Sequence, residues 1–436
     1  MKFVSTRDPS LSATASVALL EGMAPDGGLY VPEALPAADM RSLDGSAPMH
    51  ELAATLLAPF FTGDPLARSL EAISVEALEV HVPLGTVQGK PAHLSILELF
   101  HGPTAAFKDF GARFLAACLA RVRREDARPV TVLVATSGDT GGAVASAFHG
   151  RPGVRVLLLY PEGRVSAIQE RQLTCWGGNV RSLAVQGSFD DCQRLVKQAF
   201  ADASLRKRHA LTSANSINIG RLLPQLVLFA SAALRVREAR GGFANFVIPS
   251  GNLGLGTACA YARAMGLPID GIVLAHNANR TVPDFFALGE WKPRSSVATL
   301  ASAMDIGDPS NMERLFALHP DRAELRRKLR AASVDDAEIR DSIRTEFERS
   351  GLVLCPHTAA GFTAYRGLPE RDRLAGHWVV AATAHPAKFP ETVEPLVGRR
   401  VDAPPALAHL LQGQTSRNLI RAELAELVAH LESPQG

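Results

Sequence analysis

The chain has 436 residues, of which 47% are hydrophobic and 21% are charged, and its formal net charge is +2. This length predicts two or three domains, because single hydrophobic cores stop growing well below it. The near-neutral charge without a basic block disfavours a nucleic-acid partner. We find no stretch close to the ~20 apolar residues of a membrane helix, and the opening MKFVSTRDPS lacks the apolar core of a signal peptide.

The cysteines are odd in number, far apart and in no CxxC spacing, so we expect neither a metal site nor a disulfide. Buried thiols of this kind suit a reducing compartment, and we expect a cytoplasmic protein. The five cysteines are Cys118, Cys175, Cys192, Cys259 and Cys355.

Residues 1–90 are rich in Ala, Leu and Pro and predict a mainly helical N-terminal domain with irregular connections. From about residue 93, strand and helix patterns alternate. Continuous apolar runs over 129–137, 154–161 and 179–187 predict strands that are covered on both faces, each followed by a helix. Alternation of this kind implies a mostly parallel sheet.

The pattern restarts with a strand, a glycine loop and a helix over 245–266 and a strand over 269–279. The charged segment 313–350 predicts exposed helices, and 377–386 predicts a late strand. We therefore predict an α/β protein with two open, mostly parallel units. The expected domains are residues 1–90, 91–235 and 236–436.

The segment HGPTAAFKDFGARF places Lys108 between Phe107 and Phe110, after a Gly-Pro turn. Burial of an ammonium is costly, so a lysine here would have a lowered pKa or an anionic partner. A lowered pKa makes the amine nucleophilic and suits a Schiff base. The local sequence leaves a second interpretation open, in which Lys108 lies beside an apolar patch or pairs with Asp109.

Two glycine-rich turns, at 135–143 and 249–256, each follow a strand and precede a helix. Glycines let a backbone approach an anion, and the N–H groups at a helix N-terminus favour negative charge. Neither turn has the glycine order of a dinucleotide-binding loop, which weakens the alternative of a nicotinamide-dependent oxidoreductase. A purely structural turn remains possible at both places.

Two further polar segments could contact a ligand. In TSANSINIGR, residues 212–221, Asn and Ser can hydrogen-bond an anion and Arg221 can bind it with two donors. The same residues would also serve as an ordinary helix cap. In TAHPAKF, residues 383–389, polar side chains follow an apolar strand, where α/β proteins bind their ligands.

Together, HGPTAAFKDFG, ATSGDTGG, TSANSINIGR, PSGNLG and TAHPAKF resemble the threonine synthase family, in that family's chain order. The N-terminal DGGLYVPE, residues 26–33, resembles it too, so the resemblance covers essentially the whole chain. It implies the tryptophan-synthase-β-like fold of fold-type II enzymes, with pyridoxal phosphate (PLP) bound between two α/β domains.

The resemblance also implies roles for individual residues. Lys108 matches the Schiff-base lysine and Thr383 the residue that faces the pyridine nitrogen. The loop that binds the cofactor phosphate is matched by Ser250, Gly251, Asn252, Leu253 and Gly254. The loop beside the cofactor's 3-hydroxyl and the substrate carboxylate is matched by Ser137, Gly138, Asp139 and Thr140, with Asp139 on the cofactor side. Positions near the substrate phosphate are matched by Asn215, Ser216 and Arg221.

The chain departs from the family at two places, because Leu253 stands where an aromatic residue is common and Leu255 where Asp or Asn is common. The implied reaction converts O-phospho-L-homoserine and water into L-threonine and phosphate, with Lys108 as the main proton carrier. A different PLP-dependent phospholyase or dehydratase is the alternative enzyme, and a non-catalytic relative is the alternative class. The sequence leaves open whether the protein is a monomer or a homodimer.

Overall fold

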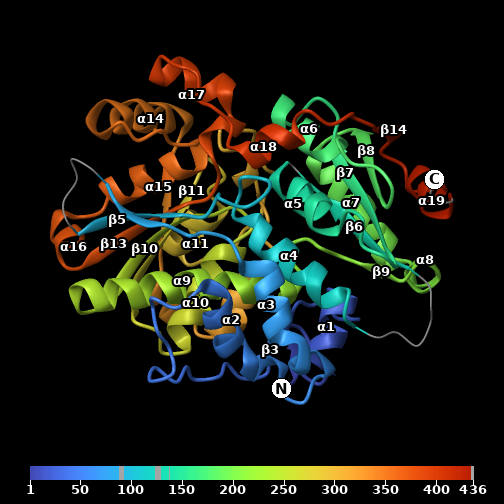
Figure 1. Cartoon of the computed structure of the whole chain (residues 1–436), viewed down its shortest axis with the longest axis horizontal. Helices are drawn as coiled ribbons and strands as arrows, with labels where there is room; N and C mark the ends of the chain where they lie inside the picture. The colour runs from blue at the N-terminus through green and yellow to red at the C-terminus, as the bar shows by residue number, and fades with distance from the viewer. Residues whose placement is uncertain (88–92, 123–128, 137, 434–436) are drawn as a thin grey trace.

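The computed structural model describes residues 1–87, 93–122, 129–136 and 138–433. Two sheets lie side by side with helices around them, and the N-terminal segment packs beneath both (Figure 1). The larger sheet has six strands and the smaller has five, and both are parallel except for one edge strand. The α/β architecture predicted from the alternating pattern is therefore confirmed.

The six-stranded sheet has the order β12-β11-β10-β13-β5-β4, in which only β4 runs antiparallel to its neighbour. In that order its strands are Arg330–Ser333, Ile269–His276, Ala244–Pro249, His377–Ala382, Leu94–Glu98 and Leu84–Thr86. Its helices are α9 (Ile219–Arg240), α10 (Gly254–Ala264), α11 (Thr281–Leu288), α12 (Met312–Leu318), α13 (Arg322–Lys328), α14 (Asp336–Ser350), α15 (Pro356–Arg366), α16 (Glu370–Leu374) and α17 (Pro390–Val397), with short 3-10 turns η3 (Ser302–Met304) and η4 (Pro386–Lys388).

The five-stranded sheet has the order β14-β8-β7-β6-β9 and is parallel throughout. In that order its strands are Asn418–Arg421, Val180–Gln186, Val154–Pro161, Val130–Ala135 and Leu211–Thr212. Its helices are α4 (Lys108–Leu119), α5 (Asp139–Phe148), α6 (Ala167–Thr174), α7 (Phe189–Ala201), α8 (Ala203–His209), α18 (Pro405–Leu410) and α19 (Leu424–Glu432). Every residue of β6 and β7 is buried, which explains why both strands are apolar apart from Thr131 and Arg155.

The N-terminal segment has helices α1 (Ala15–Glu21), α2 (Met49–Leu57) and α3 (Leu70–Leu78) and 3-10 turns η1 (Ala58–Phe61) and η2 (Pro65–Ser69). It also contains an antiparallel sheet of three short strands, β1 (Phe3–Ser5), β2 (Ser12–Ala13) and β3 (Tyr30–Pro32), which the sequence analysis did not predict. Strands of two or three residues carry too little periodicity to be recognised.

Two strands cross the boundaries expected from the sequence. Strand β5 follows the first boundary, yet it pairs with β13 of the six-stranded sheet. Strand β14 lies near the C-terminus, yet it pairs with β8 of the five-stranded sheet, so the red end of the chain lies beside the green strands in Figure 1. The division at residues 90 and 235 stays a prediction, and each of the two large sheets contains a strand from the other side of an expected boundary.

Two other sequence predictions need correction. The segment 313–350 is not helical throughout, because β12 forms an edge strand on β11; the sequence RAAS has little β propensity, and its pairing is imposed by the neighbouring strand. Helix α9 is long and apolar enough by composition to cross a membrane, contrary to the sequence analysis. Within the most apolar 18-residue stretch of α9, 94% is buried inside the protein, as in a core helix.

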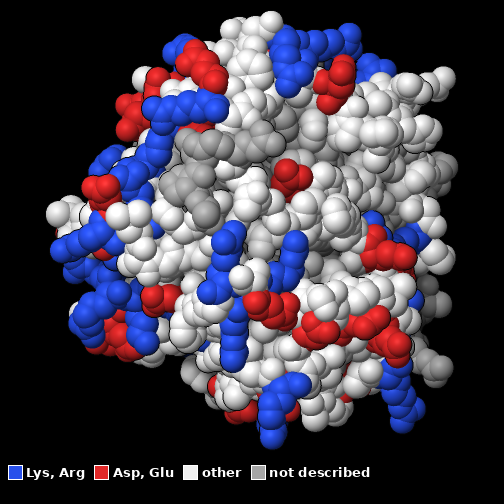
Figure 2. All heavy atoms as spheres, turned by 60° about the vertical axis from the view of Figure 1, so that its left-hand side comes forward, with Lys and Arg blue, Asp and Glu red and all other residues white. Residues whose placement is uncertain are grey.

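The surface carries both signs of charge. Figure 2 shows one face on which basic and acidic side chains are interspersed, with the longest run of basic side chains along its left edge. Charges of opposite sign that lie close together weaken one another's field at a distance.

Candidate active site

Lys108 is the first residue of α4 and lies where the two sheets meet. The turn before it pairs with the chain that follows β13: Phe107 N donates to Thr383 O at 2.9 Å, and His385 N donates to Ala105 O at 3.0 Å. Ala106 and Ala384 form a β-bridge between them. This pairing brings together the two motifs that contain Lys108 and Thr383.

Asp109 does not pair with Lys108, although the sequence left that interpretation open. Its carboxylate is buried and accepts hydrogen bonds from Thr104 N at 2.9 Å and Thr104 Oγ1 at 2.7 Å. Asp109 therefore closes the turn on the side away from the amine, and Lys108 stays available to a ligand.

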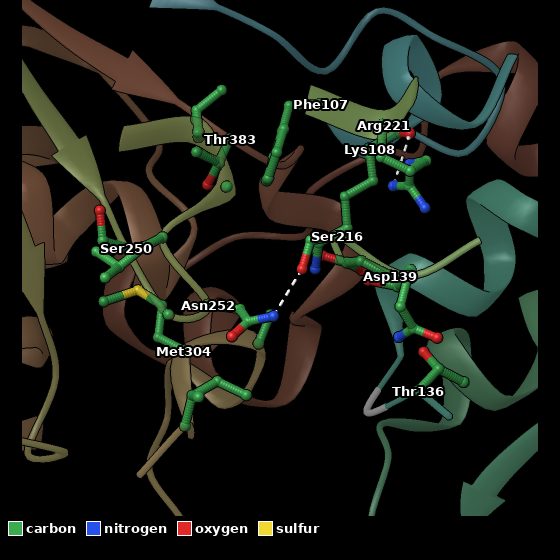
Figure 3. Close-up of a pocket in the computed structure, with 18 of the residues that line it drawn as sticks. Phe107, Lys108, Thr136, Asp139, Ser216, Arg221, Ser250, Asn252, Met304 and Thr383 are labelled. Carbon is green, nitrogen blue, oxygen red and sulfur yellow. Dashed lines mark hydrogen bonds between the residues drawn. The ribbon is translucent and has the colours of Figure 1, made fainter. Parts of the chain in front are cut away.

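Lys108 faces a cavity between the two sheets, whose lining combines apolar side chains with a small set of polar and charged ones (Figure 3). Most of the residues predicted for the site line this cavity. They are Lys108, Asp139, Thr140, Asn215, Ser216, Arg221, Ser250, Gly251, Asn252, Leu253, Gly254 and Thr383. The tertiary structure thus joins segments that are far apart in the sequence.

One predicted residue that the structure describes, Gly138, is not among the lining residues. Gly138 precedes α5 with φ +138°, a backbone conformation that favours glycine, and a Cβ there would meet the side chain of Gln169 at 2.6 Å. Gly138 therefore allows the backbone of this turn to pack against Gln169, and its role in binding the substrate stays a prediction. Ser137 lies outside the described residues.

The loop from Ser250 to Gly254 has the form of an anion cradle. It leads into α10 through Leu253 with φ +61°, and among the described residues no side chain caps that helix N-terminus. A Cβ on Gly251 would lie 2.8 Å from Ala303 O and from the Cα of Met304, so only glycine fits there. Free N–H groups at a helix N-terminus favour a bound phosphate.

Asn252 and Ser216 connect this loop to the segment before α9. Asn252 Nδ2 donates to Ser216 Oγ at 2.6 Å, the contact dashed in Figure 3. Ser310 N donates to Asn252 Oδ1 at 2.6 Å. The two polar segments that the sequence treated separately therefore lie side by side along one wall of the cavity.

Arg221 is buried and its guanidinium donates to Ala214 O and, at 3.3 Å, to Lys108 O, as Figure 3 shows. Its Nε has no partner among the described residues. Burial lowers the pKa of Arg221 to about 10, so it remains a cation at neutral pH. Asn218 caps α9 by accepting from Gly220 N at 2.9 Å, so this segment is both a helix cap and a wall of the cavity.

Burial and the neighbouring charges together set the pKa of Lys108. Burial lowers the pKa of Lys108 to about 8; the carboxylate of Asp139 opposes this shift, and the cations of Lys388 and Arg221 add to it. The ring of Phe107 lies 5.7 Å from its Nζ. A substantial fraction of the amine is then neutral near physiological pH, as a nucleophile or a proton acceptor requires.

Asp139 begins α5 and forms an ion pair with Lys388, with Nζ and Oδ1 2.7 Å apart. Burial alone would raise the pKa of Asp139, but Lys388 and Lys108 hold it well below its ordinary value. Asp139 is thus a permanent negative charge beside Lys108. Its contact with the cofactor stays a prediction.

The sequence analysis missed His357, which comes from the start of α15 and lines the cavity. Its Nε2 accepts from Ala303 N at 3.1 Å, and its Nδ1 has no partner among the described residues. Burial lowers the pKa of His357 to about 4. A neutral ring with Nε2 as acceptor carries its proton on Nδ1. No local pattern marks this residue, because it is a single histidine in an otherwise small and apolar helix start, outside the motifs quoted above.

Comparison with known proteins agrees with this geometry. A family model described as pyridoxal-phosphate dependent enzyme matches residues 89–383, and models for the threonine synthase N-terminus and C-terminal part match residues 2–78 and 358–431. The threonine synthase of Serratia marcescens is 40% identical over 411 residues, 94% of either chain. The chain belongs to the threonine synthase family. Its cofactor is pyridoxal phosphate, and it is a lyase of threonine biosynthesis.

Solved structures of the family share the fold. Threonine synthase from Escherichia coli superposes with a TM-score of 0.91 at 36% identity, covering 99% of each chain. The PLP-bound threonine synthase from Brucella melitensis gives 0.89 at 35% identity, covering 99% of this chain and 98% of that one. The predicted fold class is therefore confirmed.

The residues present fit the cofactor. An amine of lowered pKa, an uncapped helix N-terminus with a glycine that a Cβ would block, and the strand-end hydroxyl of Thr383 all border one cavity. These groups match an aldehyde, a phosphate and a ring nitrogen, the three functional parts of PLP.

Proposed function

We propose that the protein converts O-phospho-L-homoserine and water into L-threonine and phosphate. The observation that carries this proposal is one cavity that combines Lys108 with the helix-start loop at Ser250–Gly254 and the polar segment at Asn215–Arg221. Such a cavity provides anion-binding groups for two phosphates, one on the cofactor and one on the substrate.

Lys108 would hold the cofactor covalently between turnovers. When bound, PLP supplies an electron sink for the negative charge that develops on substrate carbon atoms. Once its amine is free, Lys108 takes the proton from Cα of the substrate and then one from Cβ, and it returns a proton to Cγ after phosphate has left. Its lowered pKa suits both directions of proton transfer.

The remaining residues would orient the reactants. Asn215, Ser216 and Arg221 hold the leaving phosphate, and Thr140 binds the substrate carboxylate. The Thr383 hydroxyl, which lines the same cavity, would hold the cofactor ring by a hydrogen bond to its nitrogen. Water adds at Cβ inside a cavity whose walls limit other reactions of the unsaturated substrate.

The test replaces Lys108 with alanine and uses Lys197→Ala, an exposed lysine on α7, as the matched control. Wild-type protein and the control should release phosphate from O-phospho-L-homoserine and form threonine in equal amounts. Lys108→Ala should lose turnover by more than the ~10²–10⁴-fold that proton transfer alone contributes, because it also loses the covalent anchor. Formation of a 2-oxo acid from serine or threonine, without phosphate release, would show a dehydratase instead.

We also propose a cytoplasmic location. The five cysteines are free thiols, and four of them are buried, which suits a reducing compartment. Alkylation of Cys175, which is the accessible one, in intact and lysed cells would test whether it is kept reduced.

A further inference from the structure

We propose that Lys388 is a positioning residue that fixes the turn carrying Lys108 through its contacts with Asp139 and Thr104. The inference rests on the proposed role of Lys108 as the cofactor-binding amine. It gives Lys388 a function in the reaction although it is not among the residues that line the cavity.

The contacts of Lys388 reach both partners from a fully buried position. Its side chain has 0% exposure, and its Nζ lies 2.7 Å from Asp139 Oδ1 and donates to Thr104 O at 2.9 Å. Thr104 lies in the turn four residues before Lys108 and 284 positions away from Lys388 in the chain. One ammonium thus holds together the two segments that border the reactive amine.

The network continues on both sides of the ion pair. Gln169 Nε2 donates to Asp139 Oδ1 at 3.1 Å, and Gln172 Nε2 donates to Thr104 O at 3.1 Å, both from α6. Lys388 belongs to η4, which follows β13 of the six-stranded sheet, whereas Asp139 begins α5 after β6 of the five-stranded sheet. The ion pair therefore connects the two sheets next to Lys108.

Charge balance gives the pair a second effect. Besides each other, the charged or titratable groups coupled to Lys108 or Asp139 are Lys388, Arg221, His357 and Cys355. At pH 7 His357 and Cys355 are neutral, because burial lowers the pKa of the imidazole and raises that of the thiol. Without Lys388, the carboxylate of Asp139 would have Lys108 as its nearest cation. An unpaired buried carboxylate is costly, so it would hold Lys108 in the charged form, which does not attack an aldehyde.

The experiment follows capture of PLP by the apo-protein, with trapping by borohydride and mapping of the modified peptide. Lys388→Met keeps an unbranched side chain only one atom shorter and removes the charge. We expect its capture at pH 7.5 to be at least 10-fold slower than in wild type and the pH midpoint of capture to move upward. Asp139→Asn should move the midpoint downward, because the remaining neighbours of Lys108 are cations. The control is Lys328→Met, an exposed lysine of α13.

The double variant Asp139→Asn/Lys388→Met removes both members of the ion pair, so neither is left without its partner, and it controls for misfolding of the single Lys388 variant. We expect this variant to keep the wild-type melting temperature and to shift the pH midpoint of PLP capture back toward the wild-type value. Capture should stay slow, because Lys388 no longer holds the turn at Thr104. Wild-type capture rate and midpoint in either Lys388 variant would overturn the proposal, and so would a change in melting temperature alone. Modification of a lysine other than Lys108 in the wild-type protein would instead refute the proposed function.

Discussion

Arg314 offers a sharp test of how the site is supported, because its buried guanidinium joins its own helix α12 to two distant segments. It donates to Tyr30 O at 3.1 Å, Ser216 O at 3.0 Å and Ile217 O at 2.6 Å. It also donates to Asn311 Oδ1 at 2.6 Å. The residue thus ties the N-terminal sheet to the polar segment before α9. We predict that Arg314→Met weakens both the fold and the site.

The magnitude follows from the acceptors that lose their donor. Each buried carbonyl left unpaired costs about 1–3 kcal/mol. The carbonyls of Tyr30, Ser216 and Ile217 lose their donor, and if the structure around them adjusts in part, the total cost should be about 3–5 kcal/mol. An unfolding entropy of roughly 2.1 cal/mol/K per residue gives about 0.9 kcal/mol/K for the whole chain if it unfolds cooperatively. The melting temperature should then fall by about 3–5 °C.

Differential scanning calorimetry of the apo-protein measures this change. The matched control is Arg327→Met on α13, where an arginine that is 69% exposed faces Asp321 at 3.7 Å and should contribute almost nothing. The phosphate-releasing reaction should show a raised KM for Arg314→Met, because Ser216 loses its backbone support. Equal melting temperatures for the two variants would refute this account of Arg314.

Two other predictions concern the cofactor. Gly251→Ala should weaken PLP binding at least 10-fold in fluorescence titrations, because its Cβ would lie 2.8 Å from Ala303 O. The control Gly367→Ala should bind PLP normally, because its Cβ would have its nearest neighbours at 3.6 Å. Equal affinities of the two variants would contradict the role of the Ser250–Gly254 loop in binding the cofactor phosphate. The rate at which apo-protein captures PLP should rise from pH 7 to pH 9 and then level off, because the pKa of Lys108 is lowered to about 8 and the neutral amine is the nucleophile. An inflection near the ordinary lysine pKa, measured by stopped-flow absorbance, would show that burial does not tune this amine.

The sequence predicted the local elements of the fold well where they are long and apolar. The run at 154–161 matches β7 residue for residue, and 129–137 contains β6. Such runs are informative because a strand covered on both faces has few solvent-facing positions, so most of its residues are apolar. The edge strand β12 has no such run, and its neighbour β11 decides its conformation.

The residues around Lys108 left its role open, and the resemblance to a family implied that it binds the cofactor. The structure supports this prediction physically, because burial and the opposing charges of Asp139 and Lys388 set the pKa of the amine. Pairing of Lys108 with Asp109 was reasonable from adjacency alone. It does not occur, because the first turn of α4 directs Asp109 back to Thr104.

By itself, the sequence determined the alternating α/β pattern, the two glycine-rich helix starts and the set of segments from which the site is built. Only the tertiary structure decided which of these segments meet. The Lys388–Thr104 contact, the support of Ser216 by Arg314 and the hydrogen bond from Ala303 N to His357 Nε2 join residues that are far apart along the chain. Local periodicity reports burial and conformation within a segment, whereas such contacts depend on how whole elements pack, and no short pattern encodes that.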